Sequence, residues 1–143
     1  MTGRLHRVAM GLLVADGRVL LAHRHPLRQH YPDCWDGVGG HIEAGESPEQ
    51  ALVRECLEEI GVTVTRWRAL DPPVVRLGED LELHTFVVDT WSGTPTNLAP
   101  EEHDDLAWVE PGELDSLRLA HPGLVPLITA ALGRRSGDAS GGG

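Results

Sequence analysis

Residues 40–62 read GHIEAGESPEQALVRECLEEIGV, a stretch that holds one helix with both of its ends marked. Ser47 is a preferred N-cap residue, Pro48 suits the first helical position, and Gln50 completes a capping box with the serine. Gly61 is placed to end the helix, because glycine readily adopts the left-handed conformation that closes many helices. The stretch therefore predicts a helix that begins at Pro48 and ends just before Gly61.

Apolar side chains recur along this helix at positions i, i+3, i+4 and i+7, which are Val53, Cys56, Leu57 and Ile60. In an α-helix this spacing brings side chains to one face. We therefore expect these four residues to form the buried stripe, with Cys56 packing as a small apolar side chain rather than acting as a reactive thiol.

Three carboxylates, Glu55, Glu58 and Glu59, lie at i, i+3 and i+4 and converge on a face next to this stripe. Such anions repel one another unless a cation lies among them, and oxygen-rich clusters select hard ions such as Mg²⁺ or Mn²⁺. A solvated acidic face is the commoner meaning of a run of charges. The flanking residues decide between these two interpretations.

Two flanking features favour a functional cluster. Glu46 precedes the helix and Arg54 precedes the carboxylates, so that an anion and a cation are placed to orient them. Gly39 and Gly40 lie before the helix, and a backbone without side chains can approach a metal ion or a phosphate closely. A simple surface helix needs neither feature.

The whole stretch is similar to the signature of the Nudix hydrolases, which is Gly, five residues, Glu, seven residues, then Arg-Glu-apolar-x-Glu-Glu-x-Gly-apolar. The fixed positions all agree, and they are Gly40, Glu46, Arg54, Glu55, Glu58, Glu59 and Gly61. Two positions depart from the usual pattern: Val38 stands where many members have Pro, and Cys56 stands where Leu is more common. The resemblance implies an α/β fold, an α/β/α sandwich with a mixed β-sheet, over roughly residues 5–132.

The resemblance also implies a divalent metal ion, Mg²⁺ or Mn²⁺, and attack of water on a phosphorus of a pyrophosphate. In this interpretation Glu46 and Arg54 do not bind the metal ion themselves but contact and orient the carboxylates that do. The metal would be held by carboxylates of the helix and by a backbone carbonyl ahead of it, which assigns Glu55, Glu58, Glu59 and either Gly39 or Gly40.

Candidate residues also lie outside the signature. Members of the family often use one more acid, and an acidic run before a predicted strand offers Glu102 first and Asp105 next. Arg24 is a candidate to hold a phosphate, and Trp35 or Tyr31 to stack on a base. For each of these residues a structural role is an equally good interpretation: a solvated acidic loop, a surface ion pair or a core aromatic.

The remaining segments predict a sheet around the helix. Strands are expected over residues 5–14 and 18–22, joined by an Asp16-Gly17 turn, and a surface loop follows over residues 23–36. Further strands are predicted over 62–65, 73–77, 81–91 and 105–109, and closing helices over 111–117 and 121–132. We expect one domain over residues 1–133 and a disordered, Gly/Ser-rich tail over 134–143.

Length and composition narrow the function. A chain of 143 residues suits one domain. With 22 Asp and Glu against 12 Lys and Arg, the formal charge is −10, which disfavours polymeric nucleic acid as a partner. Two cysteines are too few for a disulfide framework, and the apolar run near the N-terminus is too short to span a membrane. We therefore expect a cytoplasmic protein that acts on a small nucleotide without a membrane partner, and a homodimer is one option for its assembly.

Our leading hypothesis is a nucleoside triphosphate pyrophosphatase resembling the MutT-type enzymes that remove oxidised nucleotides such as 8-oxo-dGTP. A pyrophosphatase of ADP-ribose or of a nucleotide sugar is the alternative within enzymes. A nucleotide-binding Nudix domain without catalysis is an alternative of another class, and the retention of every acid of the signature argues against it.

Overall fold

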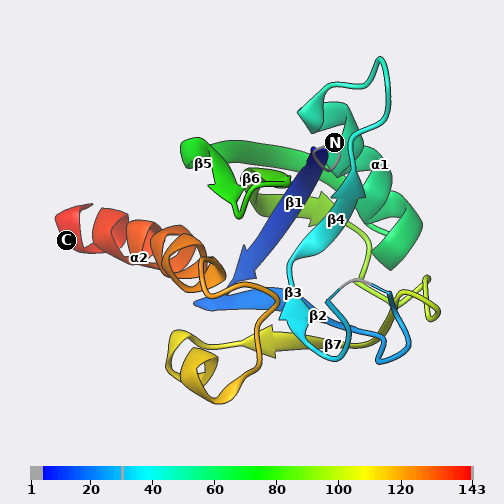
Figure 1. Cartoon of the computed structure of the whole chain (residues 1–143). Helices are drawn as coiled ribbons and strands as arrows, with labels where there is room; N and C mark the ends of the chain where they lie inside the picture. The colour runs from blue at the N-terminus through cyan, green and yellow to red at the C-terminus, as the bar shows by residue number, and fades with distance from the viewer. Residues whose placement is uncertain (1–4, 30, 143) are drawn as a thin grey trace.

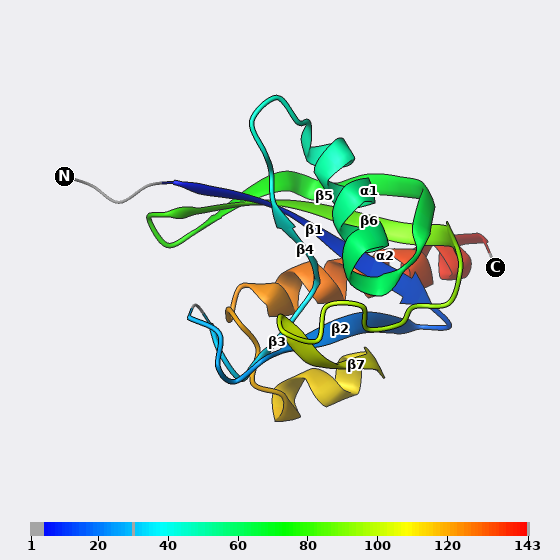
Figure 2. The same ribbon diagram turned by 90° about the vertical axis from the view of Figure 1, so that its right-hand side faces the viewer.

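The computed structural model of the protein describes residues 5–29 and 31–142, with side chains up to residue 133. Within this part of the chain seven strands form a mixed sheet with one helix on each face (Figures 1 and 2). The strands are β1 (His6–Ala15), β2 (Arg18–Arg24), β3 (Trp35–Asp36), β4 (Val38–His41), β5 (Thr63–Leu77), β6 (Leu81–Ser92) and β7 (His103–Val109). The helices are α1 (Pro48–Ile60), the short 3₁₀ helix η1 (Pro111–Ser116) and α2 (Leu124–Gly142).

Strand β1 connects the whole sheet. It runs parallel to β6 on one side and antiparallel to β4 and β2, and the order along the main path is β3-β2-β1-β6-β5. Strand β4 pairs with β1, and β7 pairs with β2. This arrangement places the start of β7 and the loop after β2 close to the strand that leads into α1.

The two faces of β1 bury different cores. Met10, Leu12 and Val14 pack with α2, whereas Ala9 and Leu13 pack with α1. Successive side chains of a strand point to opposite faces, so a strand covered on both faces is apolar throughout its buried part. The expected α/β/α sandwich is thereby confirmed.

Helix α1 has the ends that the sequence predicts. The Ser47 hydroxyl accepts a hydrogen bond from the Gln50 backbone N–H at 3.1 Å, and the Gln50 side chain accepts one from the Ser47 N–H at 2.9 Å. Gly61 closes the helix with φ of 70°. These bonds satisfy backbone groups that a helix end leaves without partners.

The buried side of α1 differs from the predicted stripe. Cys56 and Ile60 are fully buried as expected, but Leu57 is 52% exposed and Leu52 is buried in its place. Positions 52, 56 and 60 follow an i, i+4, i+8 row, so the helix faces the sheet along a slightly rotated line. The same rotation turns Glu59 inward, where it is only 4% exposed.

Two further elements differ from the prediction. Strand β5 is continuous where two strands were expected, because it pairs with β6 on both sides of a register irregularity between Ala69 and Val74. Helix α2 continues to Gly142, across the segment predicted as a disordered tail. A helix that has already started on the core can add turns through local hydrogen bonds alone. Residues 1–4 and 143, at the ends of the predicted domain and tail, lie outside the described residues.

No helix among the described residues is long and apolar enough to cross a membrane.

Candidate active site

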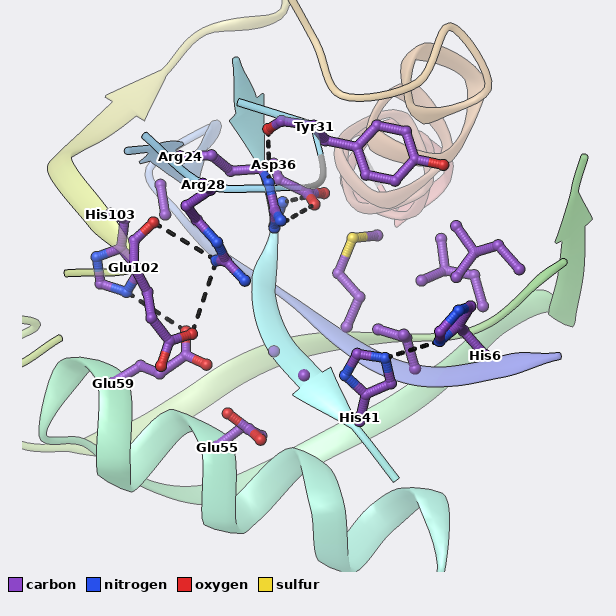
Figure 3. Close-up of a pocket in the computed structure, with 18 of the residues that line it drawn as sticks. His6, Arg24, Arg28, Tyr31, Asp36, His41, Glu55, Glu59, Glu102 and His103 are labelled. Atoms are coloured by element: carbon purple, nitrogen blue, oxygen red, sulfur yellow. Dashed lines mark hydrogen bonds and ion pairs between the residues drawn. The ribbon is translucent and has the colours of Figure 1, made fainter. Parts of the chain in front are cut away.

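A cavity of about 470 Å³ lies beside α1 and is lined by residues of α1, β1, β4, β6, the loop between β2 and β3, and the start of β7. Its two ends differ in chemistry, as Figure 3 shows. Glu55, Glu59 and Glu102 lie at one end, whereas Tyr31 and the pair of His6 and His41 lie toward the other. The cavity therefore joins a carboxylate-rich end to an end with aromatic and apolar walls.

Glu55 and Glu59 form the centre of the acidic end. Their side chains share a hydrogen bond and are 13% and 6% exposed. Burial raises the pKa of both carboxyls to about 7, and the proximity of Glu59 raises that of Glu55 further. Two buried carboxyls this close hold a proton between them, so they titrate as a pair. Glu59 thus lies beside Glu55 in the acidic cluster, with its side chain buried.

Arg54 orients the acidic end from the side. Its guanidinium binds both oxygens of Glu46, at 2.7 and 2.9 Å, and donates to Glu55 Oε2 at 3.0 Å. This bidentate bond lowers the pKa of Glu46 to about 2. Arg54 also donates to the His41 backbone carbonyl at 3.1 Å, so one side chain ties α1 to β4. Arg54 thus contacts both Glu46 and Glu55, and the supporting role of Glu46 and Arg54 in catalysis stays a prediction.

Glu58 lies at the rim of the cavity. Its side chain is 59% exposed, and one of its oxygens lies 3.3 Å from Arg54. The three helix carboxylates are therefore unequal, since Glu55 and Glu59 are buried and Glu58 faces solvent.

Gly39 and Gly40 lie on β4 against the carboxylates. A Cβ atom on Gly39 would overlap the Ala9 carbonyl oxygen of β1, and one on Gly40 would lie 2.5 Å from Glu55 Oε2. Only glycine leaves room at these two positions, and the backbone of β4 consequently lies in contact with the Glu55 carboxylate. This is the close approach that the Gly-Gly pair predicts.

Residues 5–130 of the chain match the NUDIX domain family. The chain belongs to the Nudix hydrolases. A CTP pyrophosphohydrolase from Escherichia coli (strain K12) is 35% identical over 135 residues, which cover 93% of this chain and 96% of the relative. An 8-oxo-dGTP diphosphatase from Proteus vulgaris is 36% identical over 94 residues, covering 65% of this chain and 83% of the relative.

Solved structures agree with this assignment. The solution structure of the E. coli ORF135 protein has a TM-score of 0.71 at 30% identity and covers 94% of this chain and 93% of that chain. A MutT Nudix hydrolase from Burkholderia pseudomallei has a TM-score of 0.69 at 29% identity, covering 77% of this chain and 86% of that chain. The Nudix signature of this chain therefore lies in the same fold as in its relatives.

Nudix hydrolases generally use a divalent metal ion. Among the described residues, no group of three or more His, Cys, Asp or Glu side chains is already arranged to hold one. The residues at the acidic end nevertheless fit such an ion. The Glu55 and Glu59 carboxyls lie side by side with little exposure to solvent, and the backbone at Gly40 has room for no side chain beside Glu55. Carboxylate and carbonyl oxygens are the ligands that Mg²⁺ and Mn²⁺ prefer.

Glu102, the first candidate acid outside the signature, lines the cavity. It lies close enough to raise the pKa of Glu59 by electrostatic repulsion. Asp105, the second candidate, is not among the residues that line the cavity, and its carboxylate accepts from the Leu106 N–H. Asp104 is bound to His23 at 2.7 Å. Of this acidic run, Glu102 alone lines the cavity.

Arg28 is a residue of the site that the sequence interpretation missed. Its guanidinium lies 3.7 Å from Glu102 Oε1 and 3.5 Å from the Glu102 carbonyl oxygen. Arg24, which was predicted, also lines the cavity and lies 3.8 Å from Asp36. Two guanidinium groups therefore line the cavity, Arg24 from the end of β2 and Arg28 from the loop that follows, and the density of Arg and His over residues 23–30 of the sequence was the signal for both.

The aromatic candidates separate in the structure. Tyr31 lines the cavity, and its ring contacts that of His121 with centroids 4.4 Å apart. Trp35 is not among the lining residues; it packs on the apolar core on the α2 side, and its ring contacts His23. Trp35 is thus a core residue here, and its prediction as a stacking partner is corrected, because β3 pairing with β2 turns its side chain away from the cavity.

Proposed function

We propose that the protein is a divalent-metal-dependent pyrophosphohydrolase that converts nucleoside triphosphates to nucleoside monophosphates and pyrophosphate, of the type that removes oxidised nucleotides. One observation carries this proposal. A single cavity has carboxylates and Arg28 at one end, apolar and aromatic walls at the other, and Arg24 between Asp36 and Tyr31, so it offers a place for phosphates and a place for a base. The relatives that act on CTP and on 8-oxo-dGTP support the same substrate class.

The acidic end accounts for the chemistry of hydrolysis. Water adds to a phosphorus of the triphosphate, the P–O bond of the anhydride breaks, and the proton of the water leaves to a carboxylate. A bound Mg²⁺ or Mn²⁺ would neutralise the phosphate oxygens and lower the pKa of the attacking water. Glu102 lines the cavity and lies close enough to Glu59 to raise its pKa, so of the acids outside the helix cluster we assign it the proton. The ion would be held by Glu55, Glu58, Glu59 and a carbonyl oxygen of Gly39 or Gly40.

Arg24 and Arg28 hold the phosphates in this proposal. Both line the cavity, and a guanidinium binds two phosphate oxygens through parallel N–H groups. In the structure the Arg28 guanidinium lies beside the Glu102 carboxylate. A phosphate that binds here would replace this carboxylate as the anionic partner of Arg28.

The opposite end is suited to a base that carries an amino group. Met10 and Leu83 contribute apolar surface, and Tyr31 contributes a ring. Asp36 also lines the cavity, beside Arg24. One of its oxygens accepts from the Gly37 N–H at 2.8 Å, and the other lies 3.8 Å from the Arg24 guanidinium. A carboxylate accepts hydrogen bonds from an amino group, which cytosine and guanine carry and uracil lacks.

Location and assembly remain proposals as well. We propose that the protein acts in the cytoplasm on free nucleotides and that its strongly negative charge keeps polymeric nucleic acid away. The homodimer stays a prediction, which analytical ultracentrifugation tests directly.

The test is a substrate panel. The purified protein with Mg²⁺ is assayed on CTP, 8-oxo-dGTP, UTP and ADP-ribose, with pyrophosphate and nucleoside monophosphates quantified separately. We expect turnover of CTP or 8-oxo-dGTP with release of pyrophosphate, and slower turnover of UTP. Asp36→Asn is expected to reduce the preference for CTP over UTP by ~10-fold, which is the scale of one lost hydrogen bond to a charged group. A preference for ADP-ribose would overturn the proposal.

A further inference from the structure

His103, the first residue of β7, is buried against the acidic end of the cavity. Its side chain is 4% exposed, and neither ring nitrogen has a hydrogen-bond partner among the described residues. Burial lowers the pKa of its imidazole. A buried polar group without a partner costs free energy, and such a group in a native protein calls for a reason.

The reason lies in the position of the ring. His103 Nε2 is 3.4 Å from Glu59 Oε1, and the Glu59 side chain is 6% exposed, so the two groups face each other out of solvent (Figure 3). The contact is longer than the bonds of Arg54, but the removal of solvent strengthens any bond that forms there.

The backbone of His103 is held without help from the ring. Its N–H donates to the Ala99 carbonyl at 3.0 Å, and its own carbonyl accepts from the Asn97 side chain at 2.7 Å. The Glu102 N–H donates to the same Ala99 carbonyl at 2.9 Å. One tight turn therefore positions both Glu102 and the ring of His103. The ring nitrogens take no part in holding this turn, so they are available for another contact.

We propose that His103 is a positioning residue for Glu59: its ring donates through Nε2–H to the Glu59 carboxylate and fixes the direction in which that carboxylate meets a cation. An N–H donor orients the carboxylate and leaves its charge in place, whereas a charged partner such as Arg54 would compete with the metal. The consequence for turnover rests on the proposed function, but the contact itself does not. Outer partners of this kind typically contribute 10–100-fold to metal affinity.

The test compares His103→Leu, which keeps an apolar volume and removes the donor, with His103→Gln, which keeps an N–H group. His84→Leu is the matched control, because His84 is a largely buried histidine bound to Glu82 at 2.8 Å outside the cavity lining. Binding of Mn²⁺ to each protein is measured by electron paramagnetic resonance without substrate, and kcat and KM are measured with CTP.

We expect His103→Leu to weaken Mn²⁺ binding ~10–100-fold and to lower kcat with little change in KM. His103→Gln is expected to stay within about threefold of wild type, as is the control. Equal Mn²⁺ affinity in wild type and His103→Leu would overturn the proposal, and so would an equal loss in the Leu and Gln variants.

A second measurement uses the wild-type protein alone, so it does not depend on the folding of any variant. Nitrogen-15 NMR of the ring distinguishes the two neutral forms; we expect the Nε2–H form, and the Nδ1–H form would overturn the proposal. The outcomes also separate this inference from the proposed function. If no nucleotide is hydrolysed while His103→Leu still weakens Mn²⁺ binding, the proposed function fails and the positioning role stands.

Discussion

Glu59→Gln is expected to make the metal-free protein more stable while it removes activity. Glu59 has a pKa of about 7 in the folded protein against an ordinary value of 4.5, because its carboxyl is buried and lies near Glu102, while the hydrogen bond with Glu55 offsets only part of this rise. The folded protein therefore binds this proton more tightly than the unfolded chain. The resulting loss of stability is absent below about pH 4.5, grows between pH 4.5 and 7, and is complete above pH 7.

The size of the effect follows from that pKa. A rise from 4.5 to about 7 corresponds to about 3 kcal/mol of destabilisation at pH 8. Glutamine has the same shape without the charge, and its amide can still donate to Glu55, so the substitution removes up to this amount. The two carboxyls share one proton, which makes about 3 kcal/mol an upper bound. For a chain of this size it corresponds to a rise in Tm of up to roughly 10 °C.

The assay is thermal unfolding of wild type and Glu59→Gln in excess EDTA at pH 4 and pH 8, then with Mg²⁺. At pH 8 in EDTA we expect a higher Tm for the variant than for wild type, and at pH 4 we expect equal Tm values. Addition of Mg²⁺ is expected to raise the Tm of wild type more than that of the variant. Turnover is expected to fall ~100-fold or more, a loss of about 2.7 kcal/mol or more of transition-state stabilisation. A variant that melts below wild type in EDTA at pH 8 would refute the reasoning, because the buried charge would then carry no penalty.

Three further outcomes are expected. Hydrolysis stops in excess EDTA and returns with Mg²⁺ or Mn²⁺, and full turnover in the chelator contradicts the metal requirement. Glu102→Gln lowers kcat ~100-fold, whereas Asp104→Asn and Asp105→Asn change it less than about threefold; three equally mild effects on the measured rates would remove Glu102 from the chemistry. Glu46→Gln lowers Tm at neutral pH, because Arg54 holds the Glu46 pKa near 2 in the folded protein. Since that stability is present above pH 4.5 and is lost as the pH falls towards 2, the Tm difference shrinks over this range, and a constant difference would contradict the assignment.

Local features of the fold were predictable because local hydrogen bonds and backbone preferences create them. The capping box at Ser47 and the left-handed Gly61 place both ends of α1 correctly. The turn between β1 and β2 has positive φ at Asp16 and Gly17, 55° and 75°, as an Asp-Gly hairpin requires. Each of these features depends on residues within four positions of one another.

The direction in which side chains point was less predictable. The apolar pattern of α1 includes Leu57 and leaves out Leu52. In the structure, however, Leu52 is buried and Leu57 is exposed. Both rows are consistent with a helical period, and only the sheet beneath the helix selects between them. Trp35 shows the same limit, because the pairing of β3 with β2 decides which way its ring turns.

The sequence by itself determined the family, the helix that carries the chemistry, and the spacing of Glu55, Glu58 and Glu59, because all of these are properties of one continuous segment. Only the tertiary structure decided that two of these carboxylates are buried and that the third is exposed at the rim. It also brought Arg28 and His103 to the cavity, from a loop and a strand separated by more than seventy residues. The pairing of β7 with β2 brings these two residues to the same cavity. Strand pairing between distant segments depends on the packing of the whole sheet rather than on any local pattern.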